Sequence, residues 1–92
     1  MNKLEKARLT IDEIDTEIIK LFEKRMTVVK DVIEFKIENG MPILDSNREA
    51  IMLEKNLKKI SNEEYKKYYS LVLEGFLNAS KVLQKDILEK NK

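Results

Sequence analysis

The chain has no cysteine and no histidine, and it contains only two glycines and one proline among its 92 residues. The lack of cysteine excludes disulfides and thiolate chemistry. The lack of histidine removes the commonest zinc ligand and the usual general base, so we expect no metal site. Because so few residues favour turns, the composition predicts an all-α fold.

Charge and hydropathy also argue against two kinds of partner. Charged residues make up 38% of the chain, but 18 cations against 17 anions leave a net charge of +1. This balance gives no reason to expect nucleic acid or an anionic membrane surface. No apolar run approaches the roughly 18 residues that span a bilayer, and residues 1–5 do not begin a secretory signal. We therefore expect one cytoplasmic domain over residues 1–92.

Apolar residues recur at spacings of three and four from Leu4 to Phe35, which predicts one long amphipathic helix. Gly40 and then Pro42 are expected to end it. A helix of about 36 residues is roughly 54 Å long, whereas a compact globule of this chain would be only about 30–35 Å across. The apolar face of this helix, which we call the seam, is too long for a monomer to cover. It therefore predicts a homodimer in which two long helices cover each other. A kink or a projecting end is the alternative.

Two shorter helices are expected after the loop, from about residue 46 to 60 and from about 61 to 89, with a short tail beyond. Ser46 with Glu49 fits a capping box at the start of the second helix, although Asp45 is an alternative cap. Ser61 with Glu64 fits a capping box for the third helix.

Two cations interrupt the apolar seam of the first helix. On a helical wheel, Arg25 and Lys36 lie within about 20° of Ile18, near the centre of the apolar arc. A charge buried without a partner is costly, so each needs a counter-ion or a ligand, unless the side chain extends to water. The two are about 16 Å apart along the axis. Their long side chains are therefore predicted to hold one small dianion between them.

Three further polar features need an explanation. Arg8 lies about 25 Å from Arg25 along the helix, so we expect it to serve the partner subunit's site. Arg48 places a cation in the first turn of the second helix, where it opposes the helix dipole. Ser80 and Gln84 lie one turn apart beside the apolar face of the third helix. They are either surface residues or the neutral wall of a pocket.

These residues resemble the all-helical chorismate mutases over nearly the whole chain. The resemblance is carried by Arg8-x2-Ile11-x2-Ile14-Asp15, Arg25, Lys36, Pro42, Asp45-x2-Arg48-Glu49 and Ser80-x3-Gln84. It implies an intertwined homodimer of three-helix subunits with two equivalent sites. It also implies that Arg25 and the partner subunit's Arg8 hold the two carboxylates of chorismate, with Arg48 and Ser80 in support.

The resemblance assigns the other polar residues as well. Lys36 and Gln84 would donate hydrogen bonds to the ether oxygen of chorismate, and Asp45 and Glu49 would hold its ring hydroxyl. The rearrangement to prephenate needs no nucleophile, base or cofactor, which agrees with the composition. Two alternatives remain open at this point. One is an isochorismate-pyruvate lyase, against which Glu49 argues, and the other is a non-catalytic helical dimerisation or regulatory module.

Overall fold

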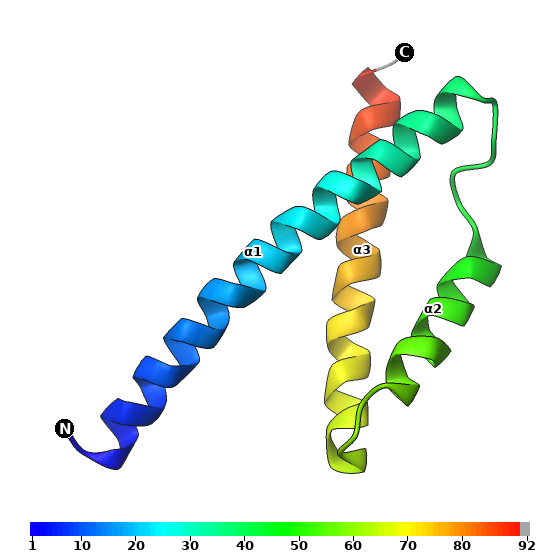
Figure 1. Cartoon of the computed structure of the whole chain (residues 1–92). Helices are drawn as coiled ribbons and strands as arrows, with labels where there is room; N and C mark the ends of the chain where they lie inside the picture. Colours follow the sequence, from blue (N-terminus) through cyan, green and yellow to red (C-terminus); the bar gives the residue numbers. More distant parts are fainter. Residues whose placement is uncertain (91–92) are drawn as a thin grey trace.

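The structure is a computed structural model that describes residues 1–90, and it contains three α-helices and one short 3-10 turn (Figure 1). The elements are α1 (Lys3–Glu38), α2 (Ser46–Lys58), the turn η1 (Glu63–Tyr65) and α3 (Lys66–Lys90). No strand occurs within residues 1–90, so the predicted all-α fold of three helices is confirmed. The expected tail falls on residues 91–92, outside the described residues.

The first helix is unbroken and ends where the sequence predicted. Gly40 has a φ of 62°, a left-handed conformation that glycine adopts without steric cost. Its N–H donates to the carbonyl of Ile37 at 3.3 Å, and the N–H of Met41 donates to the carbonyl of Lys36 at 2.8 Å. This is the hydrogen-bond pattern of a Schellman motif. The prediction for Gly40 is confirmed, and the alternative of a kinked first helix is wrong.

The start of α2 differs from the predicted capping box. Asp45 is the N-cap, and its Oδ1 accepts a hydrogen bond from the backbone N–H of Arg48 at 3.0 Å. Ser46 is therefore the first helical residue, and the predicted pairing of Ser46 with Glu49 is wrong. A carboxylate is favoured at a helix N-terminus because it also interacts with the helix dipole. At its other end, α2 finishes at Lys58, slightly before the expected residue 60.

The third helix also begins later than predicted. Asn62 caps the 3-10 turn, because its side-chain oxygen accepts from the N–H of Glu64 at 3.0 Å. The N–H of Tyr65 donates to the carbonyl of Asn62 at 3.0 Å, which tightens the chain before α3 starts at Lys66. The predicted capping box of Ser61 with Glu64 is therefore wrong. The asparagine that follows Ser61 supplies the cap instead.

The helices pack around α3, which contacts both α1 and α2 (Figure 1). Ile33 on α1 and Leu73 on α3 are the buried apolar side chains among residues 1–90. The rings of Phe22 and Phe76 stack across the same two helices, with centroids 6.3 Å apart. The core of the single chain is thus small, and it lies where the C-terminal half of α1 crosses α3.

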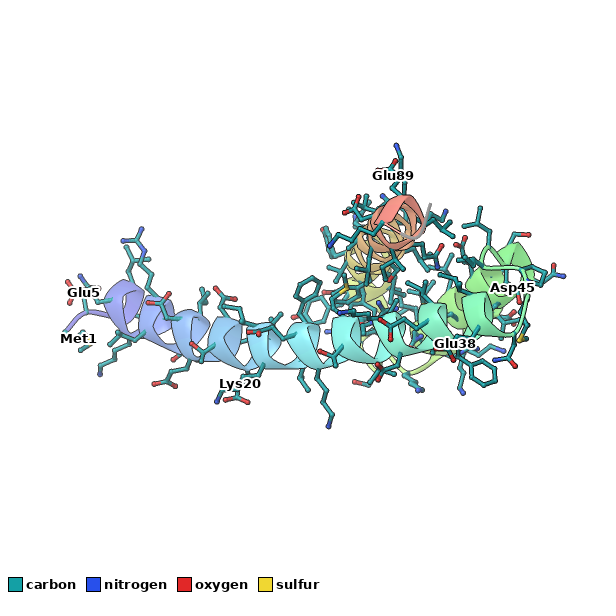
Figure 2. The ribbon with its side chains drawn as sticks, turned by 90° about the horizontal axis from the view of Figure 1, so that it is seen from above. Met1, Glu5, Lys20, Glu38, Asp45 and Glu89 are labelled. Carbon is teal, nitrogen blue, oxygen red and sulfur yellow. The ribbon has the colours of Figure 1, made fainter. Side chains whose placement is uncertain are left out.

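The N-terminal half of α1 extends away from the other helices. Figure 2 shows this segment, with Met1, Glu5 and Lys20 labelled, projecting far from α2 and α3. Every residue from 1 to 24 is exposed, and we call residues 3–20, which precede the contact of Phe22 with α3, the α1 arm. The radius of gyration is 16.8 Å, against about 12 Å for a compact chain of this length. The apolar side chains exposed along the arm are Leu4, Leu9, Ile11, Ile14, Ile18 and Ile19. Within residues 1–90, no helix combines the length and apolar character needed to cross a membrane.

The position of the core predicts a large difference between two isoleucines. Ile33 of α1 is 1% exposed, whereas Ile51 of α2, outside the α1 arm, is 55% exposed. Replacing Ile33 with alanine removes buried methyl groups and leaves a cavity, so we expect it to lower the free energy of unfolding by about 2–5 kcal/mol. The matched change Ile51→Ala should alter it by less than about 0.5 kcal/mol. Urea unfolding followed by circular dichroism measures both, and equal losses would contradict this description of the core.

Candidate active site

A pocket of about 180 Å³ lies between the C-terminal half of α1, the start of α2 and α3. Seven of the eight polar residues predicted from the sequence line it: Arg25, Lys36, Asp45, Arg48, Glu49, Ser80 and Gln84. The other lining residues are Val29, Ile43, Met52, Leu77 and Lys81. The lining includes four cations and two carboxylates, which leaves a formal charge of +2. Such a pocket attracts a small anion that also has an apolar part.

Arg25 is held in place by α3. Its Nη1 donates a hydrogen bond to Oγ of Ser80 at 3.1 Å, and its guanidinium carbon lies 5.2 Å from the centroid of the Phe76 ring. The Ser80 side chain is buried, and its hydroxyl donates to the carbonyl of Phe76 at 2.9 Å. One hydroxyl thus accepts from the arginine and donates to the backbone. The cation is oriented before any ligand binds, with most of its five N–H donors still available.

Lys36 brings a second cation to the pocket from α1. Its Nζ donates to the backbone carbonyl of Ile43 at 3.4 Å, and this contact connects the last full turn of α1 to the loop before α2. An ammonium group has three donors, so this single long hydrogen bond leaves two of them available for a ligand. The apolar stem of Lys36 lies in the partly buried seam, as the sequence predicted.

The first turn of α2 supplies both signs of charge. Arg48 and Glu49 both line the pocket, while the carboxylate of Asp45 caps the helix. Glu49 forms an ion pair with Lys81 of α3, with Oε2 and Nζ 3.4 Å apart. Because the cap is Asp45, the helix does not need the Glu49 carboxylate, which instead faces the pocket and Lys81.

The side-chain amide of Gln84 has an acceptor without a hydrogen-bond partner among the described residues. This acceptor, Oε1, is buried. An unmet buried acceptor costs about 1–3 kcal/mol, so this amide is poised to bind a donor from a ligand or from water. Rotation of the amide by 180° exchanges Oε1 and Nε2, which lets the same side chain offer a donor instead. The sequence left open whether Ser80 and Gln84 form the surface or a wall, and the structure favours the wall.

Arg8 is the one predicted residue that the chain does not bring to this pocket. It lies on the α1 arm, and its side chain is exposed. About 25 Å of helix separates it from Arg25. The separation agrees with the expectation that Arg8 does not reach the site of its own subunit, and its role in a partner's site stays a prediction.

Sequence reasoning missed Lys81 and the apolar lining residues Val29, Met52 and Leu77. Val29 and Leu77 follow the apolar periodicity of their helices, so that pattern was the signal for them. Lys81 gave no such signal, because its partner Glu49 lies on another helix and 32 positions earlier in the chain. For metals, residues 1–90 contain no group of three or more carboxylates arranged to hold an ion.

Comparison with known proteins points to one family. A sequence model of the family "Chorismate mutase type II" matches residues 7–85. The chain is 33% identical over 90 residues to the chorismate mutase of Methanocaldococcus jannaschii, with 97% of this chain and 91% of that protein aligned.

Longer relatives match as well. The bifunctional chorismate mutase/prephenate dehydratase of Buchnera aphidicola subsp. Schizaphis graminum is 37% identical over 91 residues, which are 97% of this chain and 23% of the relative. The T-protein of Haemophilus influenzae is 41% identical over 54 residues, 59% of this chain and 14% of the relative. The family match covers every residue of the pocket described above, and the chain belongs to the type II chorismate mutase family.

Proposed function

We propose that the chain is a chorismate mutase that converts chorismate to prephenate in the synthesis of phenylalanine and tyrosine. One observation carries the proposal: Arg25, Lys36 and Arg48 gather with Ser80 and Gln84 around one small pocket of formal charge +2. This charge matches a substrate with two carboxylates, and family membership identifies that substrate. The cytoplasm as the compartment and the absence of a cofactor are parts of the same proposal.

The pocket would first select the conformation of the substrate. Chorismate rearranges when its enolpyruvyl side chain folds over the ring, so that a C–C bond forms as the ether C–O bond breaks. Arg25 can bind a carboxylate with two parallel hydrogen bonds, and Ser80 already fixes its orientation. Together with Arg48 from α2, the cations would hold both carboxylates in the reactive geometry. The Asp45 and Glu49 end of the pocket would then receive the ring hydroxyl.

The pocket would also stabilise the transition state. Negative charge develops on the ether oxygen as its bond to carbon breaks. The ammonium of Lys36 and the amide Nε2 of Gln84 would donate hydrogen bonds to that oxygen. Both side chains are partly buried, so donors placed there would stabilise the developing charge more than the neutral ether. Loss of one such donor typically costs about 3–4 kcal/mol of transition-state stabilisation.

The proposal includes a homodimer that completes each pocket. Beside the pocket lies an apolar groove of about 510 Å³, to which Leu21, Phe22 and Arg25 of α1 contribute. Both this groove and the seam of the α1 arm expose apolar side chains to water. If the arm of a partner subunit covers the groove, both surfaces are buried and the partner subunit's Arg8 approaches Arg25. The exposed arm and the open groove are the observations that support this assembly.

Replacing Arg25 with alanine tests whether this arginine binds a carboxylate of the substrate. We expect Arg25→Ala to lower kcat/KM for chorismate by at least about a hundredfold, because a carboxylate loses its charged partner. Lys24→Ala removes the same charge from the next, exposed position of α1 and should keep the wild-type rate within about twofold. The assay follows chorismate loss by ultraviolet absorbance and identifies prephenate as the product. A folded wild-type protein without turnover, or one that chiefly releases pyruvate from isochorismate, would contradict the proposed function.

The pH dependence of kcat tests the role of Gln84. The amide of Gln84 donates a hydrogen bond at any pH, so kcat should stay nearly constant between pH 6 and 8. In Gln84→Glu the side chain donates only when its carboxyl group is protonated. The rate of this variant should therefore rise steadily as the pH is lowered from 8 to 5. Gln84→Leu lacks the donor altogether, and its rate should be low at every pH. A Gln84→Glu variant with a flat profile would show that Gln84 does not donate to the ether oxygen.

A further inference from the structure

The ion pair of Lys81 with Glu49 joins α3 to α2 at the edge of the pocket. Nζ and Oε2 are 3.4 Å apart, and the side chains are 46% and 28% exposed. Both residues also line the pocket. No other ion pair among the described residues joins two of the three α-helices, since the rest connect positions three or four apart in sequence. The contact is therefore a feature of the tertiary structure and not of a helix surface.

Stability alone gives a weak reason for this contact. An ion pair as exposed as this one typically contributes only about 0–1 kcal/mol to folding, because water screens the charges. The negative charge of the bound dianion gives a stronger reason for the pairing of Lys81 with Glu49. A free carboxylate among cations that must bind a dianion opposes that binding, and it can also pair with Arg48 or Lys36 and compete with the ligand. A cation paired with this carboxylate, as Lys81 is, reduces both difficulties.

The geometry leaves Oε1 of Glu49 available. Lys81 engages Oε2, and no hydrogen bond within residues 1–90 uses Oε1. The helix cap does not use Glu49 either, because Asp45 serves as the N-cap. The carboxylate is thus neutralised on one side and has an acceptor on the other, which is the arrangement needed to receive a ligand hydroxyl group.

We propose that Lys81 is a positioning residue of this site, which holds the carboxylate of Glu49 so that it accepts the ring hydroxyl of the bound dianion without repelling its carboxylates. The inference rests on the proposed function. Lys81 acts through Glu49 and does not itself touch the substrate. Its contribution belongs to binding of the ring, which is present in both the ground state and the transition state. Loss of Lys81 should therefore raise KM and leave kcat nearly unchanged.

A double-mutant cycle tests this inference. Lys81→Met in the wild-type background should raise KM about five- to tenfold, and Lys81→Arg should restore KM to within about twofold of the wild type. In the Glu49→Gln background, Lys81→Met should have almost no effect, because the group that Lys81 positions has gone. The same cycle can be measured without turnover, from the dissociation constant of prephenate for each variant by calorimetry. The test therefore still works if the Glu49→Gln enzyme is slow.

Lys85→Met is the matched control. Lys85 lies one turn further along α3, is exposed and does not line the pocket, so its loss should leave KM within about twofold. Equal effects of Lys81→Met in both backgrounds would mean that Lys81 acts directly on the substrate, and would overturn the inference. So would an unchanged KM, or a loss that Lys81→Arg fails to restore. A wild-type protein without mutase turnover would instead overturn the proposed function, and this inference with it.

Discussion

The length of α1 is the constraint on which the rest of the structure depends. A helix of 36 residues extends well beyond a core formed by α3 and the short α2. Its C-terminal half packs against α3 and supplies Arg25 and Lys36 to the pocket. Its N-terminal half carries an equally apolar seam that nothing in the single chain covers. A chain with so small a core gains much from any surface that buries this seam, and in the proposed dimer the same helix would link subunit assembly to the site.

The site is organised before a ligand arrives. Ser80 and Phe76 fix the guanidinium of Arg25, and the loop carbonyl of Ile43 holds Lys36. A cation that is already oriented loses little side-chain entropy when it binds an anion, so more of the binding energy remains for the reactive conformation. Such preorganisation suits a reaction that takes place within one molecule, because the protein then needs to supply only geometry and charge.

The sequence predicted the helical fold because that fold follows from periodicity along single helices, whereas most of the pocket residues were expected only from the resemblance to chorismate mutases. Charges within the apolar arc of α1 identified Arg25 and Lys36, and the glycine after the helix identified its end. The starts of α2 and α3 were less predictable, since several good caps stand side by side at each. Asp45 and Asn62 form the caps in place of their serine neighbours. The pairing of Lys81 with Glu49 and the contact of Arg25 with the Phe76 ring were not predicted, because each joins residues far apart in the sequence.

The central claim is that each site combines Arg25 of one subunit with the partner subunit's Arg8. The direct measurement is to unfold Arg8→Ala and Arg25→Ala proteins together in urea, refold the mixture and assay it for mutase activity. Half of the dimers should then be mixed, and each mixed dimer has one intact site, so about a quarter of the wild-type activity should return. Each variant refolded alone should remain nearly inactive. A mixture that stays inactive although its subunits have exchanged, or a refolded wild-type protein that is active as a monomer, would contradict the account.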